Sequence, residues 1–216
     1  MINVSQIRKT PSLDCQGLRF NGTTQYASAE HSSSLLFTGE LTIEWWGWIQ
    51  ENSNETYDVL IEKINDDWGL YVSNGNTPAF YCDGFPLSYG TESLTVGGYC
   101  NLGNLITFVY SSSGSYAKMY VNGVLSGTDN QIGNILNSSD KLMIGGNSGD
   151  GWIKQGVKEI RLYNRALQGA EILANYNSGD VILGDSSGLK ARYIFQNGQN
   201  SNDFSGNGNT LTFVNF

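Results

Sequence analysis

The segment LTIEWWGWIQ, residues 41–50, constrains the fold more than any other stretch of the chain. Successive side chains of a β-strand point to opposite faces, so the odd and even positions of this segment form two separate faces. The odd face is apolar and consists of Leu41, Ile43, Trp45 and Ile49. The even face holds Trp46 and Trp48 beside Thr42, Glu44 and Gln50. Because neither face suits full exposure to water, we expect one to enter a core and a loop, a partner or a ligand to cover the other.

Strand signals recur along the whole chain and are separated by Gly, Asn, Asp and Ser. The segments are 17–20, 25–28, 41–50, 58–64, 68–73, 105–110, 116–127, 141–146, 157–163, 189–195 and 209–216. Asn122 and Gly123 predict a hairpin with a type I′ turn, which needs positive φ at both central residues. The one helical pattern lies near 166–176, and we expect it to cover an edge of a sheet. The chain is therefore predicted to be all-β, with two antiparallel sheets packed face to face and a barrel as the alternative.

Length and charge limit the domain organisation and the partners. A length of 216 residues suits a single β-sandwich, so we expect one domain over 16–216 after a polar N-terminal arm over 1–15. The arm lacks the apolar region of a signal peptide, and no segment has the ~20 apolar residues that cross a bilayer. The formal net charge of −8 argues against nucleic acid, whose binding uses clustered Lys and Arg. We therefore expect neither a nucleic-acid partner nor insertion into a membrane.

The three cysteines do not form a disulfide framework in this interpretation. They are Cys15, Cys82 and Cys100, an odd number in a long chain, which is typical of small core residues. A bridge between Cys82 and Cys100 is the alternative, because their two segments could be neighbouring strands.

Five segments, taken in order, resemble the motifs of one protein family. They are GLRFNGTTQYA, LFTGELTIEWWGWI, KMYVNGVLSG, KLMIGG and GVKEIRLYNRALQGAEI, and they span residues 17 to about 176. In this order they resemble laminin-G-like, concanavalin A-like domains, which implies a two-sheet jelly-roll sandwich. The resemblance also implies a rotated strand order, because the segment LKARYIFQNGQNSNDFSGNGNTLTF is similar to one that precedes the first strand in many relatives. We expect 189–195 and 210–216 to pack beside the N-terminal strands, with 202–209 as the turn between them.

Two polar loops are candidate cation sites. The C-terminal loop has oxygen-bearing side chains at alternate positions, like the first half of an EF-hand loop: Asp203, Ser205, Asn207 and Asn209. Val214 stands where that loop needs a bidentate Glu, so a turn is preferred to a metal site. The resemblance places calcium at a rim near Asn147 and Asp150, yet two side chains supply too few of the roughly six to eight oxygen ligands. We expect no cofactor, with calcium at Asn147 and Asp150 as the alternative.

Motifs for catalysis are missing from the sequence. Glycoside hydrolysis uses two carboxyl groups about 5–9.5 Å apart, and glycanases of the resembled superfamily supply them from a strand motif ExDxxE. The nearest match, EIRLYN, has Arg161 where the central Asp would stand. The single histidine, His31, lies in a polar segment without a nucleophile motif, so we expect it to face solvent. The chain is predicted not to be an enzyme, although carboxylates from different strands could still converge.

A sugar site on a β-sandwich pairs an aromatic platform with amide and carboxylate groups. The candidate residues are Trp68, Tyr71, Tyr81, Asp83, Asn147, Asp150 and Trp152. Trp68 and Trp152 stand next to polar turns, so we expect their rings to be exposed. The sequence thus favours a non-catalytic binding or adhesion module that binds glycans as a lectin does.

The resemblance also suggests where such a module works. Compact laminin-G-like domains occur as decorations and fibre parts of phage particles, so we expect display on a virion or an extracellular surface without a signal peptide. A protein partner on that surface and a homo-oligomer are further expectations. The alternatives are a glycoside hydrolase of the concanavalin A-like superfamily and a purely structural assembly protein without a glycan ligand.

Overall fold

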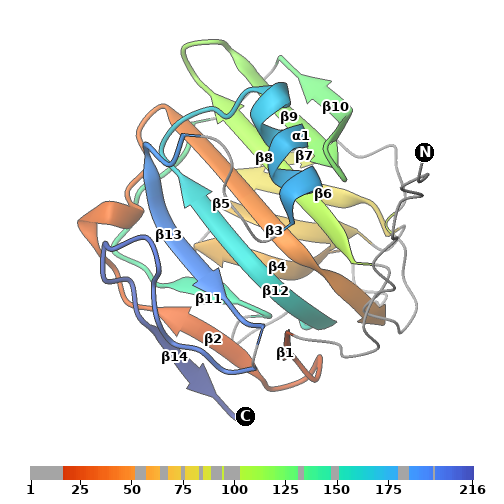
Figure 1. The fold of residues 1–216 in the computed structure, drawn as a ribbon, viewed down its shortest axis with the longest axis vertical. Helices are drawn as coiled ribbons and strands as arrows, with labels where there is room; N and C mark the ends of the chain where they lie inside the picture. The colour runs from red at the N-terminus through yellow and green to blue at the C-terminus, as the bar shows by residue number, and fades with distance from the viewer. Residues whose placement is uncertain are drawn as a thin grey trace, which may run out of the picture.

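The chain forms two seven-stranded antiparallel sheets that pack face to face, with one α-helix on the outside (Figure 1). This computed structural model describes residues 17–51, 57–63, 68–73, 76–82, 85–88, 94, 103–130, 134–146, 151–179, 185–196 and 198–216. The predicted all-β sandwich is therefore confirmed. No described helix is long and apolar enough to span a bilayer.

Sheet A has the strand order β1-β12-β3-β8-β9-β10, and β13 also pairs with β12. Its strands are β1 (Leu18–Arg19), β3 (Glu40–Glu51), β8 (Asn104–Ser111), β9 (Tyr116–Val121), β10 (Val124–Asp129), β12 (Lys154–Tyr163) and β13 (Leu189–Ile194). Sheet B has the order β14-β2-β11-β4-β5-β6-β7. Its strands are β2 (Tyr26–Ala29), β4 (Tyr57–Lys63), β5 (Trp68–Ser73), β6 (Pro78–Cys82), β7 (Phe85–Ser88), β11 (Leu142–Ile144) and β14 (Leu211–Val214). The remaining elements are a 3-10 helix, η1 (Ser33–Leu35), and the helix α1 (Gly169–Ser178).

Strand β3 is buried on both faces, as its sequence predicts. Leu41, Ile43 and Trp45 have no exposed surface and belong to the core between the sheets. On the opposite face, Thr42 and Glu44 are also buried, and the chain itself provides the cover. Trp48 is 3% exposed and lies over Gly156, where an added Cβ would come within 1.9 Å of the indole ring.

Helix α1 lies across the outer face of sheet A, in front of β3 and β8, and not at an edge as expected (Figure 1). The reason is the apolar patch that it covers. Leu167, just before the helix, and Ile172 within it form a second buried cluster with Val109, Tyr120 and Tyr163 of the sheet. The Thr42 hydroxyl donates to the Arg165 carbonyl at 2.7 Å and accepts the Leu167 N–H at 3.1 Å. These contacts fix the entry to the helix on the face of β3.

The chemistry of the turn residues confirms one predicted hairpin. Two other strands contain prolines and were missed by the sequence prediction for that reason. Asn122 and Gly123 have φ of 53° and 80° between the paired strands β9 and β10, as a type I′ turn requires. Strands β6 and β7 were not predicted, because Pro78 opens the first and Pro86 lies inside the second. Proline is tolerated at the start of a strand and on an edge strand, and β7 is the edge of sheet B.

The two ends of the described chain meet, which supports the rotated strand order. Strand β14 pairs with β2 along its whole length, and the rings of Phe20 and Phe216 lie 5.4 Å apart. Strand β13 differs from the expectation, because it pairs with β12 instead of an N-terminal strand. It shares that edge of β12 with β1, which pairs around Val157 while β13 pairs from Glu159 onward. The last two strands therefore belong to different sheets.

The loop between β13 and β14 is built as a turn around Asp203. Its carboxylate accepts the backbone N–H groups of Arg192 at 3.0 Å, Ser205 at 2.9 Å and Asn209 at 3.0 Å. Burial raises the pKa of Asp203, but these donors outweigh it and hold the pKa below its ordinary value of 3.8. The polar side chains of this loop thus organise the backbone, in agreement with the preferred interpretation.

Cys82 is a core residue, as expected, with no exposed surface. Cys15 and Cys100 lie outside the described residues, so the alternative of a bridge to Cys82 stays untested. The same holds for the N-terminal arm over 1–15.

The close approach of Trp48 to Gly156 predicts the effect of adding one methyl group. Gly156→Ala should lower the free energy of unfolding by about 1–3 kcal/mol, because the new Cβ forces the indole ring or the strand to move. Urea denaturation measures the change. Gly169→Ala is the matched control, since its Cβ would make only an ordinary 3.6 Å contact with the Tyr120 hydroxyl. Equal stability of Gly156→Ala and wild type would show that this packing is not tight.

Candidate functional site

Three tyrosines on neighbouring strands form a compact aromatic cluster on the outer face of sheet B. Tyr57 of β4, Tyr71 of β5 and Tyr81 of β6 point away from the core, because the residues that alternate with them fill it. The ring centroids lie 4.9 Å apart for Tyr57 and Tyr81, 5.4 Å for Tyr71 and Tyr81, and 6.4 Å for Tyr57 and Tyr71. All three pairs meet edge to face, which is a favoured geometry for aromatic rings. We refer to these residues as the tyrosine cluster.

A carboxylate adjoins the tyrosine cluster. The Tyr71 hydroxyl donates a hydrogen bond of 2.9 Å to Glu62 Oε2, and Glu62 is 5% exposed. Gly69 allows this arrangement, because an added Cβ would lie 2.5 Å from the Tyr71 ring. The Tyr71 ring thus lies over the glycine and holds its hydroxyl against Glu62. Tyr57 and Tyr81 are partly exposed, so their rings are the accessible part of the cluster.

A second aromatic pair includes Tyr26 of β2 in the same sheet. Trp152 is partly exposed, and its ring centroid lies 6.1 Å from that of Tyr26 on β2. Gly146 leaves room for the indole, since a Cβ there would come within 2.5 Å of it. The preceding residue, Gly151, approaches Val59 of β4, with the Val59 N–H donating to its carbonyl at 2.8 Å. Trp152 thus follows a residue that is bonded to β4, and its ring lies beside Tyr26 of β2.

The predicted site residues divide into three groups. Tyr71 and Tyr81 come together in the tyrosine cluster, and Trp152 is partly exposed as expected. The expectation that Trp68 is exposed was wrong: it has no exposed surface and packs edge-on against Phe37 at 5.6 Å in the core. Its position in β5 alternates with that of Tyr71, so the two cannot share a face. The remaining predicted residues, Asp83, Asn147 and Asp150, lie outside the described residues.

Sequence reasoning missed Tyr57 and Glu62 of the cluster. Tyr57 lies one residue before the segment 58–64 that the sequence predicts as a strand, and β4 begins with it. Between Val59 and Ile61 the pairing of β4 with β5 shifts by one residue. This irregularity reverses the simple alternation, which is why period two alone does not place Glu62 beside Tyr71.

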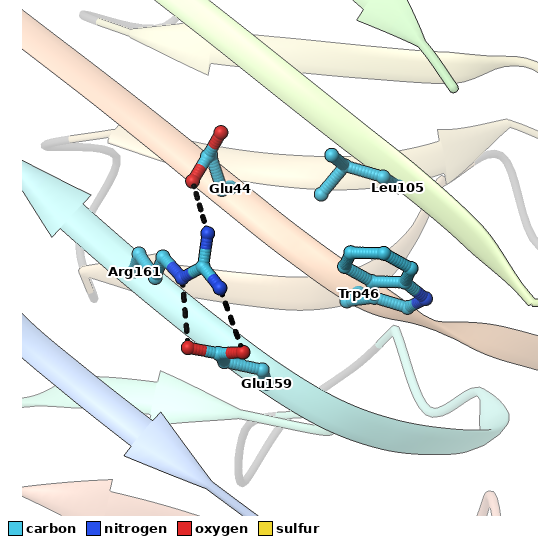
Figure 2. Close-up of a pocket in the computed structure, with 5 residues that line it drawn as sticks. All are labelled: Glu44, Trp46, Leu105, Glu159 and Arg161. Carbon is cyan, nitrogen blue, oxygen red and sulfur yellow. Dashed lines mark hydrogen bonds and ion pairs between the residues drawn. The ribbon is translucent and has the colours of Figure 1, made fainter. Parts of the chain in front are cut away.

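Two carboxylates converge from different strands on the outer face of sheet A, but an arginine lies between them (Figure 2). Arg161 donates to Glu159 through Nε at 2.7 Å and Nη2 at 2.9 Å, and to Glu44 Oε2 through Nη1 at 3.2 Å. All three side chains are at most 4% exposed. Trp46 and Leu105 line the same small pocket, and Trp46 stacks on Tyr176 of α1 at 6.1 Å.

The ion cluster joins helix and sheet. Asn175 of α1 donates to both Glu44 oxygens at 3.1 and 3.2 Å, and Arg161 Nη2 donates to the Gly179 carbonyl at 3.3 Å. Burial raises the pKa of Glu44 above its ordinary value of 4.5, against the opposing effects of Arg161 and Asn175. Both carboxylates are therefore occupied by partners within the chain, an arrangement that suits anchoring of α1.

The next question is whether the described residues could hold a metal ion or activate a nucleophile. No group of three or more His, Cys, Asp or Glu side chains among them is placed to hold a metal ion. His31 is an exposed loop residue, as expected. Calcium at Asn147 and Asp150 stays a prediction.

The raised pKa of Glu44 predicts a pH dependence of stability. A carboxyl whose pKa is higher in the folded state stabilises the fold at low pH, and this contribution is lost as pH rises through the raised pKa. The free energy of unfolding of wild type minus that of Glu44→Gln should therefore fall as pH rises above about 4.5. Urea denaturation of both proteins across a pH series measures the difference.

Glu171 provides a control of opposite sign. Its hydrogen bond with Arg165 lowers the pKa of Glu171, so its contribution is present above 4.5 and is lost as pH falls through the lowered pKa. The difference between wild type and Glu171→Gln should therefore shrink toward low pH. If the Glu44→Gln difference moved in that same direction, the assignment of a desolvated Glu44 would be wrong.

Comparisons with known proteins agree with this architecture. A sequence search of curated proteins found no match. Among solved structures, a proposed carbohydrate-binding protein from Bacteroides ovatus superposes with a TM-score of 0.71 at 16% identity, covering 92% of this chain and 58% of that protein. A SAP-like pentraxin from Limulus polyphemus gives 0.52 at 10%, covering 90% and 96%. Botulinum neurotoxin type C, whose cell entry depends on interaction with two ganglioside molecules, gives 0.52 at 14%, covering 76% and 45%.

At these identities the structural matches establish the fold alone, and the chain spans just over half the length of the Bacteroides protein. The family follows from sequence. A family model described as the concanavalin A-like lectin/glucanases superfamily, of the laminin G type, matches residues 21–173, which is more than half of the chain. The chain therefore belongs to the concanavalin A-like lectin/glucanase superfamily.

Proposed function

We propose that this domain binds glycans without catalysis, through the tyrosine cluster on the outer face of sheet B. The observation that carries the proposal is the convergence of Tyr57, Tyr71 and Tyr81 from three adjacent strands around Glu62. A pyranose ring presents C–H groups on its faces and hydroxyl groups around its edge. Partly exposed Tyr rings suit the first, while Tyr hydroxyls and a carboxylate suit the second.

The position of the cluster favours binding with a fixed geometry. Its side chains come from strands in the interior of sheet B, and rings that pack against one another lose little further freedom when a ligand arrives. The similarity to a proposed carbohydrate-binding protein and to a ganglioside-dependent toxin supports the same class of ligand.

Absence of catalysis is supported by how the carboxylates are used. Hydrolysis of a glycoside needs one carboxyl group as an acid and a second as a nucleophile or base. Glu44 and Glu159 are both hydrogen-bonded to the buried Arg161, and no pair of acids stands beside the described part of the tyrosine cluster. Glu62 alone cannot perform both roles.

We further propose display on a virion or another extracellular surface, where a glycan-binding module would meet its ligand. The net charge of −8 favours solubility in such a setting. A second candidate function, assembly with another protein, is favoured by apolar side chains on α1 and the β10 hairpin. Leu173 is 45% exposed, Val124 66% and Leu125 50%, and Leu173 adjoins the turn at Gly123.

Substitution of Tyr81 tests the proposed site. On a glycan array followed by calorimetry, Tyr81→Ala should weaken binding about tenfold or more, which corresponds to ~1.4 kcal/mol, because a partly exposed ring of the platform is lost. Tyr81→Phe should bind nearly as well as wild type. Tyr176→Ala in α1 is the matched control, because this ring stacks on Trp46 of sheet A, and a loss of binding there instead would move the site to the Trp46–Tyr176 pair.

Three further measurements separate the alternatives. Binding that disappears with EDTA would support calcium at the Asn147 and Asp150 loop. Release of reducing sugar from bound glycans would refute the non-catalytic proposal. A blank array, combined with a mass by light scattering that rises with concentration, would favour assembly over glycan binding.

A further inference from the structure

We infer that the glycan is an extended chain of linked sugars, which lies across sheet B from the tyrosine cluster to the aromatic pair of Trp152 and Tyr26. This inference rests on the proposed function and extends the same site. It follows from the place that Trp152 takes between two strands of the sheet.

Tyr26 lies on the same face of sheet B as the tyrosine cluster. Ala27 and Ala29 of β2 belong to the core, so the side chain of Tyr26 points to the outer face. The indole ring of Trp152 lies 6.1 Å from the Tyr26 ring, at an interplanar angle of 52°. Both residues are partly exposed. The outer face of sheet B therefore presents this pair together with the cluster.

The backbone before Trp152 connects the pair to the cluster. Strand β11 pairs with residues 61–63 of β4, and beyond its end Gly151 takes the place beside β4, where its carbonyl accepts the Val59 N–H at 2.8 Å. A Cβ added to Gly151 would lie 3.4 Å from the carbonyl oxygen of Tyr57. Trp152 follows one Cα–Cα step of about 3.8 Å later. Its backbone thus lies next to the strand that begins the tyrosine cluster, while its ring lies beside β2.

Two glycines fix Trp152 in this place. Gly151 has a φ of 76°, and a Cβ there would lie 2.8 Å from Cγ2 of Val59. Gly146 has a φ of 132°, and a Cβ there would lie 2.5 Å from the indole ring. The indole therefore packs directly on backbone that has no side chain. A ring held in this way loses little further freedom when a ligand arrives.

The aromatic residues cross sheet B in the order of its strands. Tyr26 is on β2, Trp152 lies beside β4, Tyr57 is on β4, Tyr71 is on β5 and Tyr81 is on β6. We refer to these five residues as the aromatic row. Neighbouring strands are ~4.8 Å apart, so the four intervals from β2 to β6 span roughly 19 Å. A single pyranose ring covers only part of this length, whereas a chain of linked sugars presents a C–H face to each part of the row.

A series of chain lengths tests the inference. Linear oligosaccharides of glucose, galactose and N-acetylglucosamine, from one unit to six, are placed on an array, and calorimetry then measures the affinity of the full chain for each length. We expect the affinity to rise about tenfold or more from the shortest bound member to the longest, because longer chains reach Trp152. Trp152→Ala should remove most of this gain and leave binding of the shortest member nearly unchanged. Tyr81→Ala should weaken binding at every length.

Three further variants serve as controls. Trp152→Phe keeps an aromatic ring and should keep most of the gain with length. Tyr26→Ala removes the other ring of the pair and should reduce the gain, which keeps the test decisive if Trp152→Ala does not fold. Phe204→Ala removes a ring that is 48% exposed in the loop between β13 and β14, where its N–H donates to the Arg192 carbonyl of sheet A. It should leave every affinity unchanged.

The outcomes separate this inference from the proposed function. An affinity that does not depend on chain length, but is weakened by Tyr81→Ala, would overturn the inference and leave glycan binding at the cluster intact. A gain with length that persists in Trp152→Ala and Tyr26→Ala would also overturn it, since longer chains would then extend in another direction. A blank array with every sugar would overturn both. A gain that is lost in Trp152→Ala and kept in Trp152→Phe supports the inference.

Discussion

Burial of β3 on both faces is the constraint on which the rest of the structure depends. One face supplies Leu41, Ile43 and Trp45 to the core between the sheets, and this alone would allow an ordinary open sandwich. The other face carries Glu44, which is tolerated under a helix only because Arg161 and Asn175 provide hydrogen bonds. The covering helix and the buried ion cluster therefore require one another. Replacing such a cluster by apolar groups can be neutral for stability, so its contribution here is best described as fixing where α1 lies.

This use of sheet A leaves the functional role to sheet B. Sheet A has two neighbouring carboxylates, as the active site of a glycosidase does. Arg161 lies between them, however, and occupies the space that a substrate oxygen and a water would need. On sheet B the outward side chains of β4 to β6 instead include Tyr57, Tyr71 and Tyr81, which meet edge to face and keep two rings partly exposed. The buried polar groups of sheet A thus stabilise the fold, while sheet B presents aromatic rings that suit a ligand.

The sequence predicts the layers of this fold better than it predicts the site. Alternation places Leu41, Ile43 and Trp45 correctly in the core, and the Asn122–Gly123 turn is found because its chemistry is local. The position of α1 on a face, and of β13 beside β12, depends on which buried surface each can reach, and no local pattern encodes that. The predicted exposure of Trp68 is wrong for a related reason. A polar turn beside a tryptophan indicates where the strand begins, but it does not indicate which face of the sheet the first side chain joins. One irregularity in β4 likewise hides Glu62.

Buried carboxylates have different roles in the two sheets. On sheet A, Glu44 and Glu159 are both paired with Arg161, and Asn175 joins Glu44 to the covering helix. On sheet B, the buried Glu62 accepts a hydrogen bond of 2.9 Å from the Tyr71 hydroxyl. The carboxylates of sheet A therefore fix the position of α1, while that of sheet B fixes the orientation of one ring in the tyrosine cluster.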